Sequence, residues 1–112
     1  MTLTGLSFRG EKITELPDDL FALENLKRLG FHYCTEIKII PDDIKKLVNL
    51  EHLDLWQTNL KYLSPELFLL PKLKSVNFAY TQYSPTKEVL DAYEIFNKKI
   101  DKPYNNKPWE NR

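Results

Sequence analysis

The chain has 112 residues, with sixteen basic and sixteen acidic side chains and a formal net charge of zero. This length suits a single domain, and the balanced charge argues against nucleic acid or an anionic membrane as a partner. The apolar runs are too short to span a membrane, residues 1–12 lack the apolar stretch of a signal peptide, and one cysteine cannot form an internal disulfide. We therefore expect a cytoplasmic protein.

Leucines recur along the chain with a long period. Leu3, Leu26, Leu50 and Leu73 lie 23, 24 and 23 residues apart, and each opens a repeat whose fourth and sixth places are also apolar. Alternation of this kind predicts a short strand with one face inward. The paired apolar residues are Leu6 and Phe8, Leu29 and Phe31, Leu53 and Leu55, and Val76 and Phe78.

A second segment, with helical spacing of its apolar residues, follows each of the first three predicted strands. The segments begin near Pro17, Pro41 and Pro65, and apolar residues recur in them at intervals of four and three. Proline suits a helix start because no backbone donor is needed there, and the neighbouring acids favour the positive end of the helix dipole. Each repeat is therefore predicted to contain one short helical turn that faces the same core.

These repeats resemble the leucine-rich repeat family in its short bacterial form, with the pattern LxxLxLxxNxLxxLPxxLxxL. The match covers residues 3 to about 83. The resemblance implies an α/β fold, a right-handed solenoid with a parallel sheet on its concave face and short helices on its convex face. Where the family has a turn asparagine, this chain has Glu11, Cys34, Thr58 and Thr81. We expect Cys and Thr to line the interior, and Glu11 to leave the first repeat frayed.

The repeat pattern ends at Tyr83, and residues 84–100 predict a longer helix. Ser84 is a capping residue type, Pro85 suits the first turn, and one face of the helix is apolar. We expect this helix to cover the open end of the last repeat. The predicted organisation is leucine-rich repeats over residues 1–83, a C-terminal capping helix over 84–100 and a polar tail over 101–112.

The sequence shows no catalytic or metal-binding constellation. It has no glycine-rich phosphate loop and no CxxC or HExxH spacing. Cys34 is expected inside its repeat and His32 outside, which argues against a thiol–imidazole pair. His32 and His52 are expected four residues apart along the strands, about 13 Å, which is too far to share one metal ion. We therefore expect no enzymatic activity, no metal and no cofactor.

The outward-facing places of the predicted strands carry an unusual set of side chains. The third, fifth, seventh and eighth places gather aromatic residues, arginines and histidines, which anchor protein interfaces because they bury a large area with few rotatable bonds. The alternative interpretation is that Trp56 and Tyr33 stack only to stabilise the sheet. The candidate partner-binding residues are Arg9, Arg28, His32, Tyr33, His52, Asp54, Trp56, Gln57, Asn77 and Tyr80.

These side chains predict a protein–protein interaction module that binds a protein partner through the concave face. Trp56 is the expected apolar anchor, with Tyr33 and Tyr80 beside it. Two alternatives stay open at this point. One is an inhibitor, such as an immunity protein that neutralises a bacterial toxin. The other is a structural protein that self-associates, as a weak homodimer through the N-terminal edge strand at residues 3–8 or through the aromatic side chains.

Overall fold

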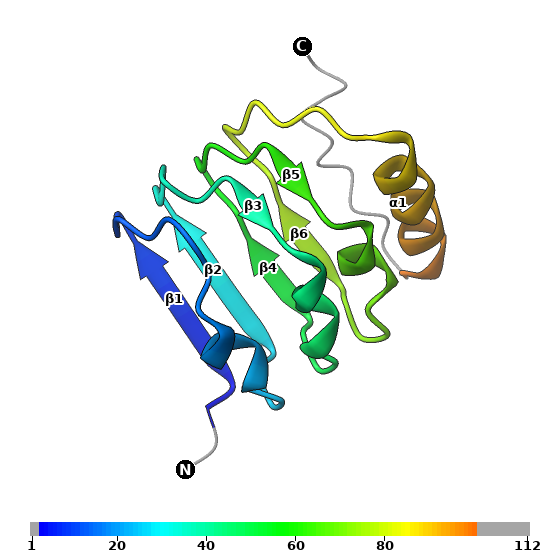
Figure 1. Cartoon of the computed structure of the whole chain (residues 1–112). Helices are drawn as coiled ribbons and strands as arrows, with labels where there is room; N and C mark the ends of the chain where they lie inside the picture. The colour runs from blue at the N-terminus through cyan, green and yellow to red at the C-terminus, as the bar shows by residue number, and fades with distance from the viewer. Residues whose placement is uncertain (1–2, 101–112) are drawn as a thin grey trace.

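The computed structural model describes residues 3–100 and places them in an α/β fold with two parallel sheets (Figure 1). The larger sheet contains, in spatial order, β1 (Gly5–Arg9), β2 (Arg28–His32), β4 (His52–Asp54) and β6 (Ser75–Asn77). Parallel neighbours need a crossover connection, so the chain leaves the sheet after each strand and returns beside it. The predicted parallel sheet is confirmed.

The four strands pair in the register that the leucine spacing predicts. Leu6 pairs with Leu29, Leu29 with Leu53, and Leu53 with Val76. The side chains of Leu29, Leu53 and Val76 are buried, whereas that of Leu6 is partly exposed. One apolar row therefore runs across the whole sheet and supplies one side of the core.

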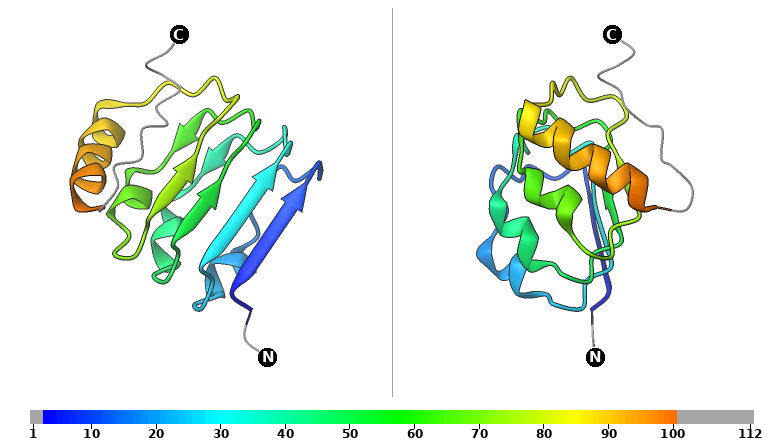
Figure 2. Two further views of the ribbon diagram at one scale, coloured as in Figure 1. Left: turned by 180° about the vertical axis from the view of Figure 1, so that it is seen from behind. Right: turned by 90° about the vertical axis from the view of Figure 1, so that its right-hand side faces the viewer.

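The segments predicted as short helical turns are 3-10 helices, and all lie on one side of the larger sheet (Figure 2). Helices of five residues gain little stability on their own. They are held to the core by the buried side chains of Leu20, Ile44 and Leu67. The three helices are η1 (Asp18–Ala22), η2 (Asp42–Lys46) and η3 (Pro65–Leu69).

The smaller sheet was not predicted from the sequence. It pairs β3 (Ile39–Ile40) with β5 (Tyr62–Leu63), two residues each, immediately before η2 and η3. Ile40 and Leu63 are buried, and Ile39 and Tyr62 are exposed. These short strands tie the second and third repeats together on the helix side of the molecule.

Small side chains at the turn position fill the interior, as expected. Cys34, Thr58 and Thr81 are buried. The Thr58 hydroxyl donates a hydrogen bond to the Leu55 carbonyl at 3.0 Å, and the Thr81 hydroxyl donates to the Phe78 carbonyl at 2.8 Å. Each threonine thus satisfies a strand-end carbonyl inside the fold, as the family's asparagine is expected to do.

The first repeat is more regular than the sequence suggested. Glu11 is exposed to solvent, yet β1 pairs with β2 over its full five residues. The first repeat is less tightly packed only in its side chains, because Leu6 and Phe8 are only partly buried against the core. The expectation of a frayed first repeat is therefore wrong for the backbone and right for the packing.

The C-terminal helix, α1, spans Lys87–Lys99 and starts later than the predicted boundary at residue 84. Thr86 is its N-cap, with its hydroxyl accepting a hydrogen bond from the Val89 N–H at 3.3 Å, so Ser84 is not the capping residue. Among residues 3–100, no helix is both long and apolar enough to cross a membrane. The predicted polar tail, residues 101–112, lies outside the described residues.

α1 lies at the end of the molecule farthest from β1, where it packs against η3 (Figure 1). Phe96 and Tyr93 are buried, and their ring centroids lie 5.4 Å and 5.3 Å from the ring of Phe68 in η3. Phe78 also contacts Phe68, at 6.1 Å. This aromatic packing supports the prediction that the helix covers the last repeat.

Candidate functional site

The face of the larger sheet opposite the 3-10 helices is left uncovered by residues 3–100 (Figure 2). We call it the open face. It contains a hollow of about 610 Å³ that is lined from all four strands. Five of the predicted site residues line this hollow: Arg28, His32, His52, Asp54 and Asn77.

Three predicted residues form an aromatic cluster at the carboxyl ends of the strands. The ring centroid of Trp56 lies 4.7 Å from that of Tyr33 and 5.7 Å from that of Tyr80, at interplanar angles of 74° and 79°. Edge-to-face contacts of this kind stabilise the fold, as expected by the alternative interpretation that Trp56 and Tyr33 stack only to stabilise the sheet. Tyr33 is nevertheless 40% exposed and Tyr80 73% exposed, so the aromatic cluster keeps a large accessible surface.

The backbone at the eighth place of each repeat is left-handed. The φ angles are 59° at Tyr33, 57° at Gln57 and 61° at Tyr80, and Gly10 has 65° at the same place in the first repeat. Each non-glycine residue in this region costs roughly 1–2 kcal/mol. Hydrogen bonds between repeats hold the conformation, for example from the Tyr33 N–H to the Trp56 carbonyl at 3.1 Å. Gln57 is exposed beside the aromatic cluster.

A chain of polar contacts crosses the open face next to the aromatic cluster. Arg9 Nη2 donates to His32 Nδ1 at 3.3 Å, and His32 Nε2 lies 2.9 Å from Asp54 Oδ2. Arginine can only donate, so Nδ1 must be unprotonated and the proton sits on Nε2. With the proton on Nε2, the contact between His32 and Asp54 is a hydrogen bond that the imidazole donates to the carboxylate.

Asp54 also positions the turn that presents Trp56. Its second oxygen, Oδ1, accepts a hydrogen bond from the Trp56 N–H at 3.0 Å. Asn77, at the same place in the next repeat, accepts from the Ala79 N–H at 2.9 Å. Both are side-chain turns of a kind that fixes the backbone two residues later. These two predicted residues therefore have a structural role as well as a place on the open face.

His52 lies at the opposite, amino-terminal end of the open face. Its Nδ1 is hydrogen-bonded to Ser75 Oγ at 2.7 Å. Burial lowers the pKa of His52, and the nearby positive charge of Arg28 lowers this pKa further. Ser75 was not among the predicted site residues, although its third place in the repeat put it directly beside His52.

The lowered pKa of His52 predicts a pH dependence of stability. Since the folded protein binds the His52 proton less readily than the unfolded chain, the free energy of unfolding should fall as the pH drops below 6.5, the ordinary pKa. His52→Gln should remove this contribution and make the pH profile flatter, with no change in slope above pH 8. Urea denaturation across the pH range measures the effect, and parallel profiles for the two proteins would contradict it.

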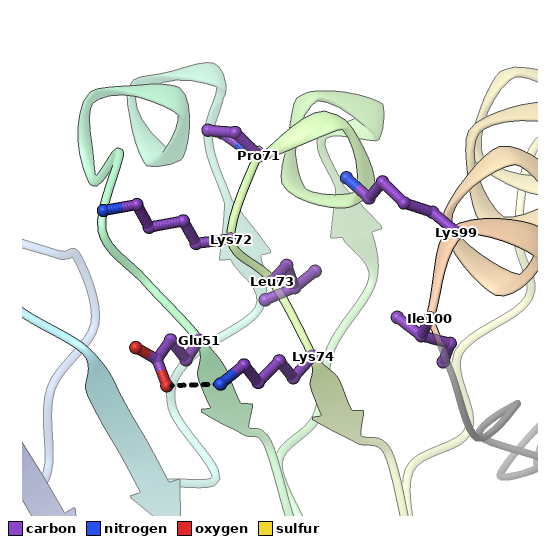
Figure 3. Close-up of a pocket in the computed structure, with 7 residues that line it drawn as sticks. All are labelled: Glu51, Pro71, Lys72, Leu73, Lys74, Lys99 and Ile100. Atoms are coloured by element: carbon purple, nitrogen blue, oxygen red, sulfur yellow. Dashed lines mark ion pairs between the residues drawn. The ribbon is translucent and has the colours of Figure 1, made fainter.

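A second hollow, of about 600 Å³, opens beside the amino-terminal ends of β4 and β6 (Figure 3). Lys72, Lys74 and Lys99 line it with one carboxylate, Glu51. Lys74 Nζ lies 3.2 Å from Glu51 Oε1, and this hydrogen bond lowers the pKa of Glu51. The sequence interpretation missed this basic pocket, because Lys99 comes from α1, 27 positions beyond Lys72.

The site contains no arrangement suited to metal binding among residues 3–100, where no three His, Cys, Asp or Glu side chains gather. His32 interacts with Arg9 and Asp54, and His52 with Ser75, so the two histidines have separate partners. Cys34 is buried in the core.

Comparisons with known proteins give little further information on this site. No protein-family model matches the chain. Over 66 residues, 59% of the chain, the sequence is 35% identical to a protein named adenylate cyclase from Schizosaccharomyces pombe (strain 972 / ATCC 24843). The matched segment spans 4% of the length of that protein. The similarity is therefore to a small part of a much longer chain, and it does not show the family of this one.

Proposed function

We propose that this chain is a non-enzymatic protein-binding module of the leucine-rich repeat type, which binds a protein partner through the open face. Three repetitions of strand and 3-10 helix, in the register set by the leucine period, support a solenoid in which the open face is the concave side. In this reading η1, η2 and η3 form the convex side.

The observation that carries the proposal is the aromatic cluster. Interface anchors are typically large, rigid side chains with a polar group, and tryptophan and tyrosine are the commonest of them. Trp56 occupies the centre of the cluster, in contact with Tyr33, Tyr80 and, at 6.2 Å, His32. The hydrogen bond from the backbone N–H of Trp56 to Asp54 fixes the turn, and the contacts with Tyr33 and Tyr80 orient the ring before any partner binds, which lowers the entropic cost of binding.

Substitution of Trp56 tests the proposal. Trp56→Ala should weaken binding of the partner by about 2 kcal/mol or more, roughly thirtyfold in affinity, because the central anchor is lost. The partner is first captured from a lysate of the source cells with the wild-type protein, then purified and measured by titration calorimetry. Both proteins must show the same thermal unfolding before their affinities are compared.

Lys45→Ala is the matched control, because Lys45 is exposed in η2 on the side away from the open face. Its affinity for the same partner should equal that of the wild type. A partner that binds Trp56→Ala normally but loses affinity for Lys45→Ala would place the interface on the helix side and refute the proposal.

The edge of β1 favours a second candidate function, self-association. Within residues 3–100, only one side of β1 is paired, and beside it lies an apolar hollow of about 230 Å³ lined by side chains that include Leu6, Phe8 and Leu16. An open strand edge next to an apolar surface can pair with a second copy of the chain. Light scattering over a range of concentrations separates the candidates, since self-association requires the molar mass to rise with concentration.

A further inference from the structure

The chain has a formal net charge of zero, but cationic side chains gather around the two hollows. Four cationic side chains line the two hollows described above: Arg28 in the first, and Lys72, Lys74 and Lys99 in the second. We call these four residues the basic rim. On the other side of the sheet, the first turns of η1, η2 and η3 carry the acids Asp18, Asp19, Asp42, Asp43 and Glu66.

The two carboxylates that line these hollows are both engaged within the protein. Glu51 pairs with Lys74 at 3.2 Å. Asp54 accepts hydrogen bonds from His32 and from the Trp56 N–H. Arg28 is exposed, and its charge acts on His52, lowering the pKa of that residue. Positive charge is therefore in excess beside the amino-terminal ends of the strands, at one edge of the open face.

The two hollows lie next to each other at the amino-terminal ends of β4 and β6. They are lined by consecutive residues of one segment, Glu51 in the second hollow and His52 in the first. Arg28 lies at the third place of its repeat and Trp56 at the seventh place of the next one. Four residues along a strand separate these two places, a distance of about 13 Å. A ligand that contacts both the basic rim and the aromatic cluster must therefore be several residues long.

We propose that the part of the partner that binds the open face is an acidic segment of a protein, which places carboxylates over the basic rim and an apolar side chain on the aromatic cluster. This inference rests on the proposed function. Arg28 supplies a fork of donors that matches a carboxylate, and the rim lysines supply positive charge around it. Complementary charge also speeds association and selects among partners.

Asp54 favours a protein segment over a nucleic acid. Nucleic acids carry a phosphate at every nucleotide, and proteins that bind a single strand follow its backbone with continuous positive charge. The Asp54 carboxylate lies between the basic rim and the aromatic cluster, and lines the same hollow as Arg28. A peptide can place an uncharged residue opposite Asp54, whereas a phosphate backbone would bring negative charge there.

Selection from a random dodecapeptide library displayed on phage tests this inference. The wild-type protein should enrich peptides with more Asp and Glu than Lys and Arg, and with at least one large apolar residue. Arg28→Glu/Lys72→Glu reverses two charges of the basic rim and should enrich basic peptides instead. The matched control, Lys38→Glu/Lys45→Glu, makes the same change of net charge at exposed positions outside both hollows and should still enrich acidic peptides.

The most enriched acidic peptide is then synthesised and its affinity measured. Arg28→Glu/Lys72→Glu should bind it at least tenfold more weakly than the wild type, and added salt should weaken the wild-type complex. The inference is overturned if the enriched peptides show no acidic bias, or if no peptide is enriched. It is also overturned if a dodecamer of uridylate binds the wild-type protein as tightly as the acidic peptide does, or more tightly. Peptides that need Trp56 for binding but contain no acidic residues would refute the acidic segment and leave the proposed function intact. Peptides that bind Trp56→Ala as tightly as the wild type would refute Trp56 as the anchor.

Discussion

Leu53→Ala should lower the free energy of unfolding by about 2–5 kcal/mol, among the largest effects of any single substitution in this chain. Leu53 is 1% exposed and lies in β4 between Leu29 and Val76, so its truncation leaves a cavity with core on both sides. The surrounding strands cannot close that cavity without breaking their register. Urea denaturation followed by circular dichroism measures the loss.

Leu6→Ala is the matched comparison, because it makes the same chemical change in the edge strand β1, at the end of the apolar row. Leu6 is only partly buried and lines the hollow beside the β1 edge, so part of its side chain is already in contact with water. Its truncation should therefore cost clearly less than that of Leu53. Equal losses at the two positions would contradict a closed centre with a loosely packed first repeat.

Phe96→Ala should lower the free energy of unfolding by about 3–5 kcal/mol, because it removes one of the two rings by which α1 contacts Phe68 in the last repeat. Phe96 is fully buried, and its ring centroid lies 5.4 Å from that of Phe68 and 5.9 Å from that of Tyr93. Loss of this contact weakens the cover over the end of the core, so the variant should also bind a hydrophobic dye more strongly.

Ile95→Ala is the control for the helix itself. Ile95 precedes Phe96 in α1 but is 59% exposed, so its replacement should change stability by no more than about 0.5 kcal/mol. Calorimetric unfolding of the two variants compares them directly. If both variants unfolded like the wild type, α1 would not contribute to the core.

The features that follow from regular spacing could be predicted from the sequence. The pairing of Leu29 with Leu53 follows from the leucine period, because residues at the same place of consecutive repeats must lie side by side in a parallel sheet. The contacts of Trp56 with Tyr33 and Tyr80 follow from the same argument. Side chains one place apart on neighbouring strands are close enough for aromatic rings to touch.

The remaining features depend on contacts that do not recur from repeat to repeat, so the periodic pattern of the sequence does not reveal them. The smaller sheet has strands of two residues, too short to show an alternating pattern. The bond between His32 and Asp54 joins different places of neighbouring repeats, so comparison of equivalent places did not reveal it. The start of α1 was misplaced because Ser84 and Thr86 are both capping types, and only the backbone geometry distinguishes them.

The left-handed backbone at Tyr33, Gln57 and Tyr80 has a consequence for anyone who engineers this protein. Glycine adopts such φ angles without strain, as Gly10 does in the first repeat. A stability screen at these positions would therefore tend to select glycine or asparagine, and at Tyr33 and Tyr80 it would remove the rings on either side of Trp56. Under the proposed function, the most thermostable descendants would then be the poorest binders, so selection for stability must be coupled to selection for binding at these positions.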